Sequence, residues 1–120
     1  MTVSDVITQA DNLRPNTLSL SRKRDWVYAL EMRIREFEVM YEPEQADDLF
    51  LREENALLSL PDEMEDMYVF YLLSMIAVSA CDIAMYNNYT AMFNQMYSDW
   101  QKKFRRENIP TKNTKSEVRV

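Results

Sequence analysis

The stretch "MYNNYTAMFNQMYSDWQKKFRREN" (residues 85–108) places large apolar side chains at intervals of three and four residues. At about 100° per residue, side chains with this spacing fall on one helix face about 100° wide, the width of a buried stripe. The spacing therefore predicts a helix. Its apolar face can serve as part of a core, as a platform for stacked bases, or as a contact surface for another protein. The stripe consists of Tyr86, Tyr89, Phe93, Met96, Tyr97, Trp100 and Phe104.

The same helical phase extends upstream of this stripe. It runs from Tyr68 without a break at Asn87 and Asn88, and acidic residues fill the first turn after Pro61, where the positive end of the helix macrodipole favours them. One helix over residues 62–107 would be about 69 Å long, more than a domain of this size needs. We therefore expect either one helix that reaches beyond its domain or a hairpin broken at the two asparagines, which tolerate the left-handed conformation.

The chain begins with a second helix signal. The hydroxyl of Thr2 can cap a helix over residues 2–13, and the carboxylate of Asp5 can return the interaction in a capping box. Apolar residues then recur along one side up to Leu13, and Pro15 ends the helix.

A third helix is expected over residues 21–41, with Ser19 or Ser21 as its cap. Apolar residues recur along it at three and four positions, and a proline follows shortly after its end. Residues 42–61 show no helical stripe and are rich in acidic side chains. This composition predicts a long acidic loop. The apolar run within it, residues 56–60, is expected to lie extended against the bundle.

The predicted fold class is therefore all-α. It is a small helical bundle with a long C-terminal helix or helical hairpin, and with an acidic loop between the second and third helices. The domain is expected to cover residues 1–108, and residues 109–120 form a polar tail that is expected to be disordered without a partner. The expected core contains Trp26, Leu30, Phe37, Leu72, Met75 and Ile76.

Composition excludes most kinds of catalytic site. The chain has no glycine, which phosphate-cradling loops require, and no histidine, the usual general base and the commonest metal ligand. The Ser-His and Cys-His pairs of hydrolases cannot be built. Cys81 is the single cysteine and lies beside an apolar run, so we expect it to be a small buried side chain. The protein is predicted to be non-enzymatic and to need no cofactor or metal.

The apolar run of residues 67–81 carries no charge over 15 residues, whereas a membrane span needs about 20. It therefore predicts a buried core helix and no membrane association. The first residues, "MTVSDVITQADNLR", lack the basic start and the continuous apolar segment of a signal peptide. A cytoplasmic location is expected.

Charge is segregated along the chain. Residues 36–66 hold twelve acidic side chains and one basic one, whereas residues 102–120 hold seven basic and two acidic ones. Between identical copies, such ends favour a head-to-tail contact. The candidate interface joins the aromatic and basic end of the last helix with the acidic loop. It comprises Tyr97, Trp100, Lys102, Lys103, Phe104, Arg105 and Arg106, and Glu44, Asp47, Asp48, Glu53 and Glu54.

Nucleic-acid binding is the weaker interpretation of this basic end. "WQKKFRR" offers both stacking rings and cations, as single-strand binding sites do. The net charge of -6 and the acidic loop oppose it, because they repel phosphate. Protein contact fits better, since Tyr, Trp, Met and Arg supply much of the contact energy at protein interfaces.

The order of segments resembles a family of small helical proteins, the head-tail connector or adaptor proteins of tailed phages and prophages. The likeness covers residues 1 to 108 and rests on "LRPN", on "RDWVYALE", on "LP" with an acidic turn before "MYVFYLL", and on "YNN...MFN...YSDW". The chain departs from the expected pattern in its "LLSLPDE" segment and in the length of its acidic loop.

The resemblance implies a structural subunit that assembles as a ring on the portal protein and joins it to other neck or tail proteins. It also implies a location in the host cytoplasm during assembly and in the neck of the finished virion. The alternative is a small cytosolic helical regulator that binds a protein partner through the aromatic stripe. A connector should form rings, whereas a regulator should remain a monomer or dimer.

Overall fold

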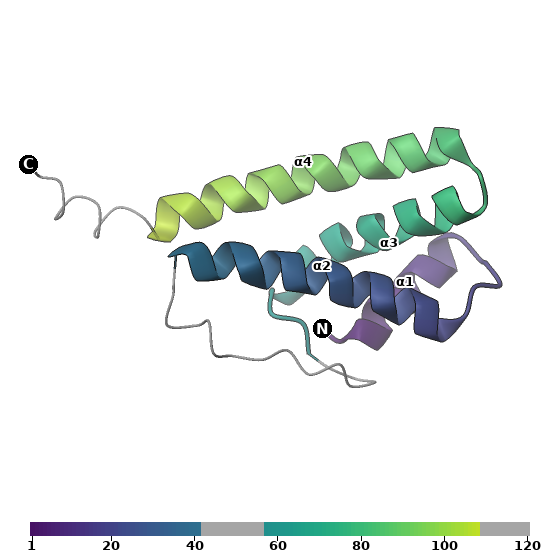
Figure 1. The fold of residues 1–120 in the computed structure, drawn as a ribbon, viewed down its shortest axis with the longest axis horizontal. Helices are drawn as coiled ribbons and strands as arrows, with labels where there is room; N and C mark the ends of the chain where they lie inside the picture. Colours follow the sequence, from purple (N-terminus) through teal and green to yellow (C-terminus); the bar gives the residue numbers. More distant parts are fainter. Residues whose placement is uncertain (42–56, 109–120) are drawn as a thin grey trace, which may run out of the picture.

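The computed structural model describes residues 1–41 and 57–108, which form an all-α bundle, as the sequence predicts (Figure 1). In this part of the chain, no helix is long and apolar enough to span a membrane. The antiparallel helices α3 and α4 form a hairpin (Figure 1). Helix α2 packs against both helices of this hairpin, and α1 packs against α3 and α2. The elements are α1 (Val3–Leu13), α2 (Leu20–Tyr41), the 3-10 turn η2 (Asp62–Met64), α3 (Glu65–Ser79) and α4 (Ile83–Asn108).

Both predicted N-terminal caps are present. The Thr2 hydroxyl accepts a hydrogen bond from the Asp5 amide at 3.2 Å, and the Asp5 carboxylate accepts one from the Thr2 amide at 2.9 Å. At the start of α2, the Ser19 hydroxyl accepts a hydrogen bond from the Arg22 amide at 3.1 Å. These bonds satisfy backbone donors that lack a partner within the helix, and they fix where each helix begins.

Both alternatives expected for residues 62–107 are wrong: the helix is not continuous, and it is not broken at Asn87 and Asn88, which lie inside α4. The chain turns instead between α3 and α4, where Cys81 adopts φ 60°. The Asp82 amide donates to the Ala77 carbonyl at 2.9 Å, and the Asp82 carboxylate accepts from the Met85 amide at 3.2 Å. The first bond closes the end of α3 and the second caps α4, so that a hairpin forms without glycine.

The expected burial of Cys81 is also wrong, because its side chain is exposed at the tip of this turn. The turn is tied to the end of α1 by an ion pair between the Arg14 guanidinium and the Asp82 carboxylate, 3.0 Å apart. The apolar pattern around the cysteine continues through the turn. For that reason, periodicity alone placed this residue inside a helix.

We expect Cys81→Gly to raise the free energy of unfolding by up to about 1 kcal/mol. The left-handed conformation costs a residue with a Cβ about 1 to 2 kcal/mol, and the greater entropy of unfolded glycine offsets part of that gain. Chemical denaturation would measure the difference, with Cys81→Ala as the matched control that keeps the Cβ. A loss of more than about 1 kcal/mol in the glycine variant would contradict the assigned turn.

The core lies where α3 meets α1, α2 and α4. Of the six expected core residues, Leu30, Leu72 and Ile76 are buried, as predicted. The other three, Trp26, Phe37 and Met75, are only half-buried, and Trp26 and Phe37 pack against the edge of the core.

The apolar side of α1 is also shorter than the sequence suggests. Leu13 is 63% exposed, whereas Ala10, one turn earlier, is buried. Of the apolar run 56–60, which was expected to lie extended against the bundle, the structure describes residues 57–60, and Leu57 is 69% exposed. Leu58 and Leu60 are buried, and the Leu58 amide donates to the Met1 carbonyl at 3.1 Å. The rest of the predicted acidic loop, residues 42–56, lies outside the described residues, as does the predicted tail.

Candidate functional site: the aromatic and basic end of α4

The end of α4 packs its aromatic residues against the end of α2. The Phe37 ring lies 5.3 Å from the Trp100 ring and 5.8 Å from the Phe104 ring, measured between centroids. Tyr41 completes the cluster, 5.9 Å from Phe104. Tilted and edge-on contacts of this kind stabilise aromatic pairs beyond their burial. The cluster therefore packs the last turns of α4 against the end of α2.

Tyr97 lies one turn before Trp100 and belongs to the same packing. Its ring stacks on Phe93 at 5.3 Å, and the Arg33 guanidinium of α2 lies 5.1 Å from its centroid. Trp100 is only 9% exposed. Most of the aromatic stripe is thus used within the molecule, and Tyr97, Trp100 and Phe104 are half-buried or buried rather than fully displayed.

The four predicted basic residues divide into two groups. Arg105 is half-buried, with its guanidinium 5.8 Å from the Phe37 ring centroid, so it covers the aromatic cluster. Lys102, Lys103 and Arg106 are exposed. The predicted acidic partners Glu44, Asp47, Asp48, Glu53 and Glu54 all lie outside the described residues. The structure therefore brings the basic and aromatic members of the candidate interface together.

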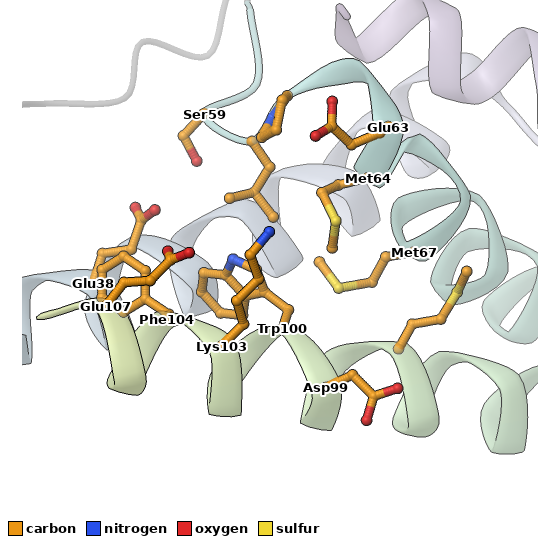
Figure 2. Close-up of a pocket in the computed structure, with 13 residues that line it drawn as sticks. Glu38, Ser59, Glu63, Met64, Met67, Asp99, Trp100, Lys103, Phe104 and Glu107 are labelled. Atoms are coloured by element: carbon orange, nitrogen blue, oxygen red, sulfur yellow. The ribbon is translucent and has the colours of Figure 1, made fainter.

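A groove of about 520 Å³ runs beside the last three turns of α4 and faces the start of α3 (Figure 2). In Figure 2, Trp100 and Lys103 rise from α4 toward Met64 and Met67 on the opposite wall. The apolar lining consists of Leu60, Pro61, Met64, Met67, Met96, Trp100 and Phe104. Four carboxylates from three elements also line the groove: Glu38 on α2, Glu63 on η2, and Asp99 and Glu107 on α4. Lys103 is the single cation among the lining residues.

One wall of this groove is anchored by a buried carboxylate that the sequence analysis missed. Glu31 of α2 is 0% exposed and accepts hydrogen bonds from the Tyr68 hydroxyl at 2.6 Å and from the Ser59 amide at 3.0 Å. The Arg35 guanidinium donates to it at 2.8 Å. The carboxylate thus joins α2, α3 and the segment before η2.

The same environment acts on the tyrosine. Burial, together with the neighbouring Glu31 carboxylate, raises the pKa of the Tyr68 hydroxyl above its ordinary value of 10.0. The phenol therefore remains a neutral donor to Glu31 throughout the physiological range. Glu31 follows Leu30 on the apolar side of α2. A single charged residue on that side was the signal in the sequence that could have indicated a buried carboxylate.

The start of α3 carries a second group of carboxylates, which the sequence attributes to the helix dipole. Burial, followed by the nearby Asp5, Asp66 and Asp62 carboxylates, raises the pKa of Glu65. Among the described residues, no group of three or more acidic or cysteine side chains is arranged to hold a metal ion.

Comparison with known proteins adds no relative: no family model, no curated protein and no solved structure matches this chain. The chemistry of the site therefore has to be read from its own residues. They supply a packed aromatic cluster, exposed cations and an apolar groove with an acidic rim. These are elements of a contact surface.

Proposed function

We propose that the protein is a structural subunit of a phage or prophage head-tail connector, which assembles as a ring on the portal and joins it to neck or tail proteins. The observation that carries the proposal is the exposure of Lys102, Lys103 and Arg106 on the last turns of a long, well-supported helix. Their position on this helix suits a repeated contact with an acidic partner segment, and the sequence holds twelve acidic residues and one basic residue within residues 36–66.

The segment order described above supports the same role. In a ring, each subunit would place the basic end of α4 against the acidic segment of the next subunit. Part of that segment is described: Glu63 is exposed beside the groove, and Glu65 and Asp66 begin α3. A heterologous contact of this kind closes into a ring when its rotation allows closure.

A small regulator that binds one protein partner is the second candidate. The groove favours it, because an apolar cleft beside Trp100 is a common form of peptide-binding site. Stoichiometry separates the two roles. Light scattering over a range of protein concentrations should show a ring for a connector, and a monomer or dimer for a regulator.

Reversing two exposed charges tests the connector proposal. We expect Lys102→Glu with Arg106→Glu to leave the subunit folded, since neither side chain is buried. Ring assembly at low salt should slow by about tenfold or more, because charges at the rim of an interface act mainly on the encounter rate. The dependence of assembly on salt should also flatten or invert. Stopped-flow light scattering would measure both effects.

The matched control exchanges the two cations, as Lys102→Arg with Arg106→Lys, and should assemble at the original rate. Unaltered assembly of the charge-reversed variant would contradict the assigned contact. If that variant instead assembled normally but lost binding to a single-stranded oligonucleotide, the basic end would be a nucleic-acid site.

A further inference from the structure

We propose that residues 109–120 fold back in the same molecule and occupy the groove beside α4. This contact lies within one subunit, so it does not depend on the proposed ring. Three observations support it: the chemistry of the groove, the chemistry of these residues, and the place where α4 ends.

The groove is suited to a cationic segment that also carries apolar side chains. Its floor is formed by carbon and sulfur atoms of Met64, Met67 and Met96 and by the rings on α4. Four carboxylates and one ammonium group stand among its lining residues, so the rim carries a net charge of about -3 when all are ionised. An anionic or purely apolar ligand would leave this rim charge unbalanced.

Residues 109–120, "IPTKNTKSEVRV", have the complementary composition. They contain three cations, Lys112, Lys115 and Arg119, against the single carboxylate of Glu117. Apolar side chains stand next to the last cation in "VRV". Such a segment can place a valine on the methionine floor while its cations meet the carboxylates at the rim.

The position where α4 ends makes the contact possible within one molecule. Glu107, the penultimate residue of α4, itself lines the groove, so the following segment starts at the groove's edge. The groove extends back along α4 to Met96, a distance of about 17 Å at about 1.5 Å per residue. Twelve extended residues reach about 40 Å, enough to reverse direction and cover it. Pro110 favours that reversal, because it cannot continue the helix.

Tethering decides between the chain's own segment and that of a second copy. A short flexible linker gives the attached segment an effective concentration in the millimolar range. A second copy at micromolar concentration offers the same residues at far lower concentration. The segment of the same molecule is therefore the favoured occupant.

Trp100 provides the reporter, because it lines the groove and the other tryptophan can be replaced. In a Trp26→Phe background, we expect Lys112→Glu with Lys115→Glu to raise acrylamide quenching of Trp100 by about twofold, since the displaced segment no longer covers the ring. The emission maximum should move to longer wavelength, and neither change should depend on protein concentration. Circular dichroism would verify that the helices are retained.

Two further variants make the test specific. Lys102→Glu with Arg106→Glu changes the net charge by the same amount outside the groove and should leave the quenching unchanged. Adding Glu63→Lys with Glu107→Lys to the segment variant restores opposite charges across the contact and should return the quenching to its original level.

Each other result overturns the proposal. An effect that grows with protein concentration would identify a second copy as the occupant. An equal effect in the control variant, no effect in the segment variant, or no rescue by the charge exchange would show that residues 109–120 do not occupy this groove.

Discussion

Glu31→Ala is expected to lower the free energy of unfolding by about 3 to 5 kcal/mol, the usual consequence of removing one partner from a buried ionic network. The variant leaves the Tyr68 hydroxyl and the Ser59 amide without the acceptor they use now. It also leaves a cavity in a site that has no exposed surface of its own. Denaturant unfolding monitored by circular dichroism would measure the loss.

The controls separate the carboxylate from its partners. Arg35→Ala leaves the buried Glu31 carboxylate without its charged partner and should also lower the free energy of unfolding, by about 3 kcal/mol, because an uncompensated buried charge is costly. Tyr68→Phe combined with Glu31→Ala should cost less than the sum of the two single changes, because both remove the same hydrogen bond. A loss below about 1 kcal/mol in Glu31→Ala would contradict the buried network.

The same network predicts the direction of the pH dependence. The pKa of Tyr68 is raised in the folded state, so the neutral phenol is favoured there more than in the unfolded chain. Its contribution to stability is complete below the ordinary phenol pKa of 10.0 and falls as the pH rises above that value.

Leu72→Ala is the second large effect, expected to lower the free energy of unfolding by about 2 to 5 kcal/mol. Leu72 is 0% exposed and lies on α3, the helix that contacts all three others. Because the neighbouring helices hold one another apart, the cavity cannot close fully after the side chain is shortened. Denaturant unfolding would again measure the change.

Leu13→Ala is the matched control, since it removes the same atoms from a side chain that is 63% exposed. It should cost less than about 0.5 kcal/mol, the usual range for surface substitutions. An equally small cost for Leu72→Ala would place Leu72 at the surface and would contradict the arrangement of α3 in the core.

The helices themselves could be predicted because their signals are local. Thr2 with Asp5 and the serine before α2 provide side-chain acceptors within the same turn, so these bonds join residues that are close in sequence. The three- and four-residue spacing in α4 likewise identified a helix with one packed face. The basic character of the end of α4 could also be read from the sequence. Only the structure shows that Arg105 covers the aromatic cluster while Lys102, Lys103 and Arg106 are exposed.

The position of the turn was decided by tertiary structure. Nothing in the apolar pattern around Cys81 distinguishes a turn from a helix, and the asparagines further on are the better turn formers. The turn forms at Cys81 because α3 and α4 can then pack along their length, while Asp82 caps α4 and pairs with Arg14 of the segment after α1. These interactions outweigh the cost of one left-handed cysteine.

Tertiary structure also decided which side chains are buried. Leu30 and Ile34 were compatible with a core face from their spacing, but the burial of Glu31 depends on donors from distant segments, the Tyr68 hydroxyl and the Ser59 amide. The half-burial of Phe37 likewise depends on where α4 ends beside α2. Sequence spacing fixes which side chains share a helix face, whereas the hydrogen-bond partners and neighbours that make burial favourable come from distant segments that only folding brings together.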